Sequence, residues 1–508
     1  MPTPRILAFA STGIPQAALL LTAGTYLPPL YTAQVGISLI AYSLATTSVR
    51  IVDLLFDPFL GWMMDRTRSP LGRFRPWFLG GVPITMVGGY MLLNPGPGAD
   101  VFYLALWYLL MWVGISMLDL AHASWAASLA VNYHERSRIY GWMTALGSVG
   151  LLALPFITQG QLVLGKAHSY HPVSLLIIIA LPLCTLLMAG FTPERPTTDS
   201  AHQRFGLKDY LSMIRRPTMM RLILADLALT LGPGVTGPLY NFFSGQIKGF
   251  PQKDINYLLI FYIGAALLGG VVWARVARRI GKHRTLQVSC VLYAIFQTSL
   301  MLIPRQLFIP TAIWMFFVGF CVSAHILMIR AMVADYADEM RLEQGRERSG
   351  ILYAMVTTTQ KLGASINVLL VFPLLQLVFQ FNPKIPLNDA FALTGLQLCY
   401  LFTPIIFVFV GGAMFFGYQL DEARHAEIRL GVEDRDRALA EAEAIEPAAQ
   451  ATAAPAAVGG GVSDFQLAPR RRGASHHRRL ASRRGRTGLG RSPHFRPASS
   501  PVHKPARA

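Results

Sequence analysis

Residues 48–77 of the chain are SVRIVDLLFDPFLGWMMDRTRSPLGRFRPW. The first half of this stretch is apolar enough for a membrane-spanning helix, yet it carries Arg50, Asp53 and Asp57. Their spacings of three and four residues place all three side chains on one face of a helix. Because an ionised group in the bilayer core costs at least about 2.5 kcal/mol, such groups rarely face lipid. The stretch therefore predicts a helix bundle with a charged site in its interior.

The composition of the chain excludes a soluble globular protein. Hydrophobic residues make up 53% of the 508 residues and charged residues only 14%, whereas a soluble domain carries about 25% charged residues. The four cysteines lie apart in apolar segments without a Cys-x-x-Cys motif, which indicates small hydrophobic side chains rather than a disulfide or metal framework. No short apolar segment with a cleavage site precedes the first span, so we expect that span to remain in the membrane.

A window of about 20 residues, the length of helix that crosses a bilayer, predicts twelve membrane spans. Their approximate bounds are 7–31, 39–64, 76–94, 101–130, 139–164, 170–192, 218–246, 254–278, 285–304, 308–333, 350–379 and 389–419. Span 7 contains Gly232-Pro233-Gly234, which predicts either a break or a kink in that helix. The connections after even-numbered spans are rich in Lys and Arg, whereas 32–38 and 95–100 contain none. Because basic loops stay in the cytoplasm, the sequence predicts a multi-pass protein of the plasma (inner) membrane with both termini cytoplasmic.

A repeated motif divides the spans into two sets of six. Gly-x-x-x-Asp-Arg begins at Gly61 and is followed by Gly-Arg eleven residues after its first glycine. Gly-x-x-x-Ala-Arg begins at Gly270, 209 residues later, and is followed by Gly-Lys at the same distance. The repeat predicts an all-α polytopic membrane protein with twelve transmembrane helices in two six-helix halves, 1–192 and 218–420, joined by a cytoplasmic linker, 193–217. The loop residues expected to act in gating are Gly61, Asp65, Arg66, Gly72, Arg73 and Arg75.

The C-terminal segment 421–508 is a cytoplasmic tail that differs from the rest of the chain in composition. A stretch rich in both acids and bases favours a short helix up to Glu446, and the tail is expected to be disordered beyond about 447. Residues 466–508 contain twelve Lys and Arg and no acid, which supplies 12 of the formal net charge of +18. This basic arm is suited to anionic lipid headgroups, or it is a solvated extension without a dedicated partner. The charge does not indicate that the protein binds nucleic acid.

Several motifs extend the charged stretch into a larger set. Asp53-x-x-x-Asp57-Pro58 leads into Asp-Arg-Thr-Arg-Ser-x-x-Gly-Arg-Phe-Arg-Pro-Trp, and His134–Arg138, Gly281–Leu286, Ala334-Asp335-Tyr336 and Gln360-Lys361-Leu362-Gly363 follow. Over residues 1–420 this set resembles the glycoside–pentoside–hexuronide:cation symporters, the melibiose-permease branch of the major facilitator superfamily. The resemblance implies the major facilitator fold and secondary active transport, in which a sugar or glycoside-like solute is carried with a cation by alternating access.

The resemblance also implies a cation site that would account for the charged face. The residues that it assigns to this site are Asp53, Asp57, Ser116, Asp119 and Lys361. Carboxylates so placed repel one another in a medium of low dielectric constant, and a proton, a sodium ion or Lys361 can each relieve that repulsion. Pairing of Lys361 with the acids would join the two halves, so it would respond to which side is open. The alternative is a purely structural ion-pair cluster that holds the bundle together.

Two departures from the family pattern bear on the ion and on the solute. Phe56 stands where sodium-dependent members often carry an amide. The loss of that oxygen disfavours a hard cation, which needs several ligands, and so favours H+ over Na+ as the coupling ion. The span-1 acid and the span-5 arginine that hold the sugar in the melibiose branch fall on Ala17 and Thr144. The solute is therefore not expected to bind as that galactoside does.

Polar and aromatic residues expected near the middle of the membrane are the candidates for solute binding: Gln16, His122, Trp125, Tyr240, Asn241 and Gln360. Trp125 is suited to stacking on the apolar face of a sugar, or to packing between helices. His122 follows Asp119 by one turn and is suited to hydrogen bonding with that acid, or to a satisfied place in the core. Asp226 is expected to pair with Arg221 or to line the cytoplasmic mouth.

Other classes of function lack a motif that supports them. The loops contain no Cys and His pair, no cluster of metal ligands and no nucleotide-binding loop, so we expect no enzyme, no metal site and no cofactor besides the coupling ion. The alternatives within the same fold are a transporter of lysolipids or other amphiphiles and a transporter-derived sensor. The expected partners are a small polar solute, the coupling cation and membrane lipid, and the chain is expected to act as a monomer.

Overall fold

The structure is a computed structural model that describes residues 2–129, 133–163, 170–194, 213–344, 349–385, 387–418, 420, 424–435 and 437. These residues contain twelve helical spans long and apolar enough to cross a membrane, and they contain no strand. This result confirms the prediction of an all-α membrane protein with twelve spans. Most of the predicted linker, the basic tail and the side chain of Asp65 lie outside the described part of the chain, so what the sequence predicts of them stays a prediction.

Most spans begin and end within a few residues of their predicted bounds. Span 1 consists of α1 (Thr3–Ala10), α2 (Gly13–Leu21), the π-helical η1 (Thr22–Tyr26), α3 (Leu27–Pro29) and the π-helical η2 (Leu30–Val35). The next five spans are α4 (Leu39–Arg66), α5 (Arg75–Leu93), α6 (Val101–Leu129), α7 (Tyr133–Val163) and α8 (His171–Phe191). The others are α10 (Pro217–Phe242) with η3 (Phe243–Ile247), α11 (Gln252–Ile280), α12 (Lys282–Leu302), α13 (Phe308–Gln344), α14 (Ser349–Pro373) with η4 (Leu374–Val378), and α15 (Ala390–Ala413).

Local sequence accounts for the start of α4, the helix that carries the charged face. The preceding segment ends at Gly36, whose φ of 92° is left-handed and favours glycine. Two residues later, the hydroxyl of Ser38 accepts a hydrogen bond from the backbone N–H of Ala41. This N-terminal cap satisfies one of the free N–H groups at the start of the helix. The helix therefore begins at a defined residue.

Span 7 is continuous although two prolines lie in its interior. α10 runs unbroken through Gly232-Pro233-Gly234 and Pro238, so of the two predicted alternatives the break is wrong and the kink stays a prediction. The glycine serves packing instead, because a Cβ at Gly232 would lie 2.9 Å from the carbonyl oxygen of Pro404 on α15. Small residues let membrane helices approach closely, and neighbouring helices help to compensate for the hydrogen bonds that proline removes.

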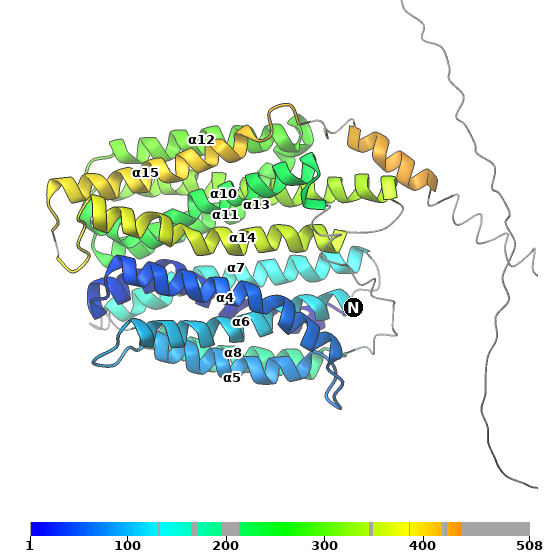
Figure 1. Cartoon of the computed structure of the whole chain (residues 1–508), viewed down its shortest axis with the longest axis horizontal. Helices are drawn as coiled ribbons and strands as arrows, with labels where there is room; N and C mark the ends of the chain where they lie inside the picture. Colours follow the sequence, from blue (N-terminus) through cyan, green and yellow to red (C-terminus); the bar gives the residue numbers. More distant parts are fainter. Residues whose placement is uncertain are drawn as a thin grey trace, which may run out of the picture. The chain divides into compact units, whose positions relative to one another are not determined.

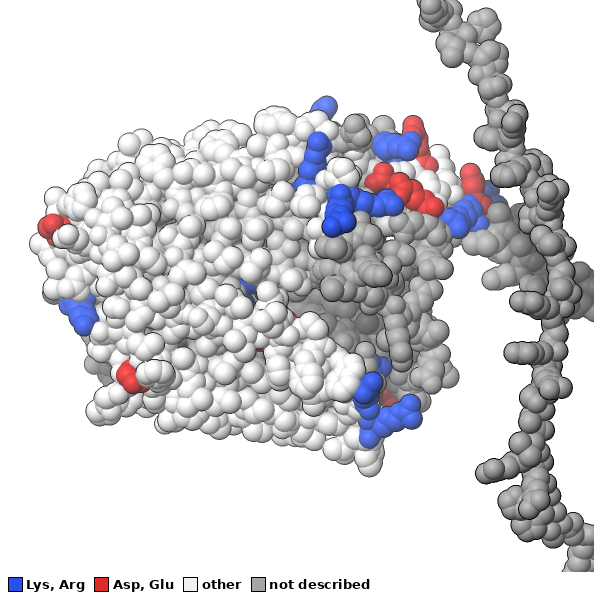
Figure 2. All heavy atoms as spheres, in the orientation of Figure 1, with Lys and Arg blue, Asp and Glu red and all other residues white. Residues whose placement is uncertain are grey.

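The helices form two groups in space (Figure 1). We call α1–α8 the N-terminal group and α10–α15 the C-terminal group. The groups meet where α4 packs against α14, α7 against α11, and η1 against α10. Figure 2 shows flanks almost free of charge, with Lys and Arg near the ends of the helices. Outward-facing apolar side chains include Phe102, 83% exposed, and Leu302, 80% exposed. Apolar flanks with charged ends are the surface that a bilayer requires.

Candidate functional site

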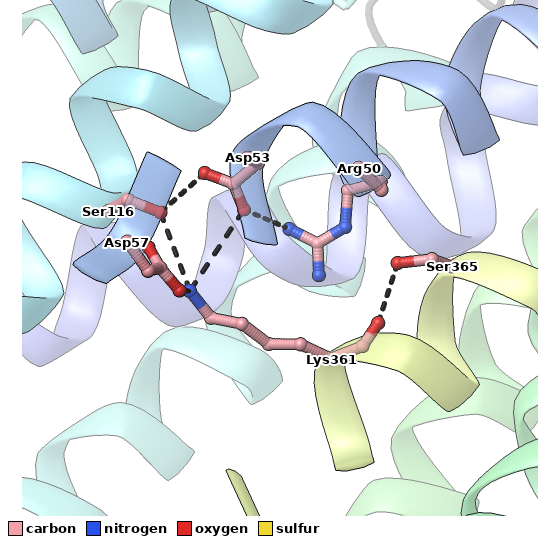
Figure 3. Close-up of polar contacts among 6 residues, drawn as sticks. All are labelled: Arg50, Asp53, Asp57, Ser116, Lys361 and Ser365. Carbon is pink, nitrogen blue, oxygen red and sulfur yellow. Dashed lines mark hydrogen bonds and ion pairs between the residues drawn. The ribbon is translucent and has the colours of Figure 1, made fainter. Parts of the chain in front are cut away.

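The charged face of α4 is turned toward α14, as Figure 3 shows. The Nη1 atom of Arg50 donates a hydrogen bond to Asp53 Oδ2 at 3.2 Å, and the two residues are 7% and 1% exposed. The guanidinium also lies 3.4 Å from the ring centre of Trp112 on α6. Such cation–π contacts are stronger where water is excluded. Arg50 is thus a buried countercharge for Asp53 within the N-terminal group.

Ser116 of α6 completes the surroundings of Asp53. Its hydroxyl donates a hydrogen bond to Asp53 Oδ1 at 2.6 Å, so both oxygens of this carboxylate accept hydrogen bonds. A buried carboxylate is tolerated when it is paired and hydrogen-bonded in this way. Groups on two helices of the N-terminal group, α4 and α6, therefore fix the orientation of Asp53.

Lys361 of α14 enters this cluster from the C-terminal group. Its ammonium forms an ion pair with Asp57 Oδ2 and lies 4.0 Å from Asp53 Oδ2. It also lies 3.5 Å from the hydroxyl of Ser116 (Figure 3). The lysine and Asp57 side chains are 21% and 18% exposed, so water screens the pair only in part. The structure thus brings four of the five predicted cation-site residues, Asp53, Asp57, Ser116 and Lys361, into one network.

Backbone contacts hold Lys361 in place. The Ser365 hydroxyl donates a hydrogen bond to the carbonyl oxygen of Lys361 at 2.6 Å. The carbonyl oxygen of Ser365 in turn accepts a hydrogen bond from Thr47 Oγ1 of α4 at 2.9 Å. The turn of α14 that carries the lysine is therefore joined to α4 at two levels, by an ion pair and by a neutral hydrogen bond. Neither Thr47 nor Ser365 was predicted, because a hydroxyl in an apolar helix has no sequence signature of its own.

Two carboxylates of the predicted cation site, Asp57 and Asp119, have oxygens without a hydrogen bond among the described residues. Asp119 of α6, one turn beyond Ser116, has no hydrogen bond or ion pair with the described residues, although the charges of Lys361 and Asp57 act on it. Asp57 Oδ1 is buried and has no hydrogen-bond partner within the described part of the chain. Asp119 is thus close to the network electrostatically but is not joined to it.

The two candidates on the later part of α6 are packed in the core. Trp125 is fully buried, edge-on to Phe9 at 5.7 Å and stacked on Phe74 at 6.3 Å between ring centres. His122 Nε2 lies 3.0 Å from the carbonyl oxygen of Phe9 and 3.4 Å from Thr12 Oγ1. The structure therefore joins His122 to span 1 and not to Asp119. For both residues the geometry matches the packing alternative.

Tyr240 and Asn241 lie at the contact between the two groups, at the end away from the basic loops. The hydroxyl of Tyr240 donates to the carbonyl oxygen of Ile255 at 2.7 Å, and Asn241 Nδ2 donates to the carbonyl oxygen of Thr25 at 2.7 Å. Gln16 of α2 is buried, and its Nε2 has no partner among the described residues. The structure thus does not bring these three residues into the Lys361 network.

Gln360 has a partner that sequence reasoning did not find. Its Nε2 donates a hydrogen bond to Asp226 Oδ1 of α10 at 3.0 Å. The predicted pairing of Asp226 with Arg221 is wrong, because Arg221 Nη1 instead donates to the carbonyl oxygen of Gly417 at 3.3 Å. Asp226 is 2% exposed, so it does not line an open mouth in this structure. The contact joins residues 134 positions apart, and no local sequence pattern predicts it.

Glu194, which follows α8, accepts hydrogen bonds from the backbone at the end of the predicted gating loop after α4. The backbone N–H of Phe74 donates to Glu194 Oε1 at 2.7 Å, and the N–H of Arg73 contacts the same oxygen. A carboxylate at the start of α5 also suits the positive end of the helix dipole. Gly72 has a φ of 109°, and a Cβ there would overlap the Glu194 carboxylate. In the sequence, Glu194 stands out only as an acid directly after span 6, which does not predict its contact with this loop.

Basic residues of this loop contact backbone oxygens and an aromatic ring. Arg73 Nε donates to the carbonyl oxygen of Met64 at 3.3 Å. Arg75 Nη2 donates to the carbonyl oxygen of Thr192 at 3.0 Å. Arg66 is exposed, with its guanidinium 4.0 Å from the Trp62 ring centre, and Gly61 has open space at its Cα. The loop is therefore tied to its own group of helices in this structure.

Comparison with known proteins gives a consistent result. The family model described as MFS/sugar transport protein matches residues 8–422. The isoprimeverose transporter of Lactiplantibacillus pentosus is 25% identical over 78% of this chain and 85% of its own length. An inner membrane symporter of Escherichia coli (strain K12), YicJ, is 22% identical over 63% of this chain and 70% of its own. The crystal structure of the nucleoside transporter NupG aligns with a TM-score of 0.59 at 12% identity, covering 81% of this chain and 98% of that one, which shows a shared fold.

Proposed function

The chain belongs to the MFS/sugar transport protein family, which makes it a multi-pass membrane transporter and not an enzyme, and on this premise we propose that it carries a sugar or glycoside together with H+. The protein would work by alternating access, as a monomer in the plasma (inner) membrane with both termini in the cytoplasm. The names of its relatives support a sugar and a coupling cation. The choice of H+ over Na+ rests on the cluster between α4, α6 and α14.

The observation that carries the proposal is the ion pair between Lys361 and Asp57, which joins the two groups of helices. In the absence of a coupling ion, the ammonium supplies the positive charge that the carboxylates need. A proton on Asp57 or Asp119 would remove that need and weaken the ion pair. α14 could then separate from α4, which is the movement that alternating access requires. The cation thus competes with Lys361 for the same carboxylates, so binding and movement are linked.

The oxygen atoms available in the cluster favour a proton over a sodium ion. Both oxygens of Asp53 already accept hydrogen bonds, from Arg50 and Ser116. Asp57 Oδ1 and the Asp119 carboxylate remain, and Phe56 adds no oxygen. A hard metal cation needs several oxygen ligands, whereas a proton needs one. Two positive side chains, Arg50 and Lys361, also stand close to the position that a metal ion would take.

Transport in proteoliposomes tests this proposal. The purified protein is supplied with isoprimeverose, lactose, xylose and glucose under either a proton gradient or a sodium gradient. We expect accumulation of at least one sugar above its external concentration under the proton gradient, and a protonophore should abolish it. Accumulation driven by sodium alone would reverse the choice of ion. No accumulation of any of these sugars under either gradient would contradict sugar symport.

A further inference from the structure

α10 and α14 form a continuous seam within the C-terminal group, and the two helices run in the same direction. Three levels of contact follow one another along it: Asp226 with Gln360, Thr230 with Gly363, and Gly234 with Asn367. At the middle level, a Cβ on Gly363 would lie 3.0 Å from Thr230 Cγ2. At the last level, Asn367 Nδ2 donates to the carbonyl oxygen of Gly234 at 2.9 Å. The seam is thus tightly packed in the middle and polar at both ends.

Each polar level leaves one acceptor without a donor. Asp226 Oδ1 is bonded by Gln360, but its Oδ2 has no hydrogen-bond partner in the described chain. Asn367 uses its amide NH2 on Gly234, and its Oδ1 likewise lacks a partner among the described residues. The residues are 2% and 7% exposed, and a buried polar atom without a partner is costly. Both missing partners are donors, and Asp226 brings a negative charge that strengthens such a bond.

The position of the seam suits a transported solute. α10 contacts η1 through Asn241, and α14 contacts α4 through Lys361 and Ser365, so both helices of the seam touch the N-terminal group. Transporters of this architecture bind solutes at the interface between their two halves, near the middle of the membrane. Asp226 and Asn367 are two helical turns apart, so the two acceptors lie about 10 to 12 Å apart along the helices. That separation is larger than one pyranose ring and fits two linked rings.

We propose that, when the two groups of helices separate, Asp226 Oδ2 and Asn367 Oδ1 accept hydrogen bonds from hydroxyl groups of a two-ring glycoside that lies over the seam between α10 and α14, on the side of the N-terminal group. The inference rests on the proposed function and adds to it a binding site and a size class for the solute. Asp226 binds hydroxyls near the level of the cation cluster, and Asn367 binds hydroxyls of the second ring.

The same geometry connects the sugar site to the cation site. Gln360, which holds Asp226, directly precedes Lys361, which holds Asp57. Two neighbouring residues on one turn of α14 therefore contact the two proposed sites, Gln360 the sugar site and Lys361 the cation site. A sugar hydroxyl bound to Asp226 would affect the hydrogen bond to Gln360, and a proton on Asp57 would weaken the ion pair with Lys361, on the same turn of α14. This arrangement gives a direct physical route by which the two solutes affect each other's binding.

Binding by the purified full-length protein tests the inference. Dissociation constants for isoprimeverose and for its component sugars, xylose and glucose, are measured for wild type, Asp226→Asn and Asn367→Ala. Asp434→Asn is the matched control, because it makes the same chemical change on a side chain that is 75% exposed. We expect Asp226→Asn and Asn367→Ala each to weaken disaccharide binding at least about tenfold. A single sugar ring should depend on only one of the two residues.

Thermal stability in detergent without sugar gives a second readout. If Asp226 serves the sugar, Asp226→Asn should melt no lower than wild type, because it removes a buried charge with an unpaired oxygen. If Asp226→Asn binds isoprimeverose as tightly as wild type, the inference is overturned and the proposed function is not. If its melting temperature is also lower, Asp226 has a structural role. Failure of the wild type to bind any of these sugars would overturn the proposed function and the inference together.

Discussion

The ammonium of Lys361 on α14 contacts the carboxylate of Asp57 on α4, although 304 residues separate the two in the chain. Each residue lies in a different group of helices, and each is buried by roughly four fifths. The pair is therefore a contact that separation of the two groups would break. The proposed coupling to H+ requires that protonation of a carboxylate be able to break this pair.

A double-mutant cycle of Lys361→Ala and Asp57→Asn should be strongly non-additive in thermal stability. Either single variant leaves a partly buried charge without its partner, whereas the double variant removes both charges. We expect a coupling free energy of about 1 to 3 kcal/mol, below the roughly 3 to 5 kcal/mol cost of breaking a fully buried pair. Unfolding in detergent measures it, with Lys361→Ala and Asp434→Asn as the control cycle. Additive effects in the first cycle would separate Lys361 from Asp57.

Asp57→Asn should abolish accumulation of sugar against its gradient but retain exchange of sugar down its gradient. A neutral amide cannot take up and release a proton, whereas the proposed sugar site at the seam between α10 and α14 keeps all its residues. Asp53→Asn should have the same effect on accumulation and should also lower stability, because Arg50 loses its countercharge. Counterflow and gradient-driven uptake in the same vesicles separate the two activities. Full accumulation in both variants would identify the charged face as structural.

Gly72→Ala should destabilise the protein by about 1 to 3 kcal/mol, the usual cost of a strained backbone conformation. Its φ of 109° is unfavourable for alanine, and the added methyl would overlap the Glu194 carboxylate. Gly61→Ala is the matched control, because a Cβ there meets nothing within 4 Å. Comparison of the two melting temperatures tests the contact of the loop with Glu194. Equal melting temperatures would contradict it.

Reporters of topology should place the basic loops inside the cell. A reporter after Trp77 or at residue 205 should be cytoplasmic, and one at 97 or 250 should be external, because Lys and Arg clusters are retained in the cytoplasm. Accessibility of inserted tags on intact cells measures this. An external tag at 205 would contradict the division into two six-helix halves.

The sequence predicted those parts of the fold that follow from local composition. The twelve spans follow from apolar runs of sufficient length, and the spacing of Arg50, Asp53 and Asp57 correctly placed them on one face. The position of Lys361 in the same cluster was available only through resemblance to a family, since no local pattern relates α4 to α14. Of the two alternatives at Gly232-Pro233-Gly234, the helix break was wrong because α10 is continuous there, and the kink stays a prediction.

The contacts of individual side chains were harder to predict from the sequence than the positions of the helices. Trp125 has an amphipathic ring that suits either a sugar or the core, and only its contacts with Phe9 and Phe74 distinguish the two. The pairing of Asp226 with Gln360 and the contact of Glu194 with Phe74 both join residues more than 100 positions apart. Such contacts depend on the rotation of each helix about its axis, which hydropathy does not determine.

The stacking of Arg50 on Trp112 has an optical consequence. The indole lies 3.4 Å from a guanidinium that also donates a hydrogen bond to Asp53, so a change of charge in the cluster alters the electric field across the ring. Indole fluorescence responds to such a field through its emission wavelength. A variant that keeps Trp112 as its single tryptophan would therefore contain its own spectroscopic sensor of the charge in the cluster, without a label and without knowledge of the solute.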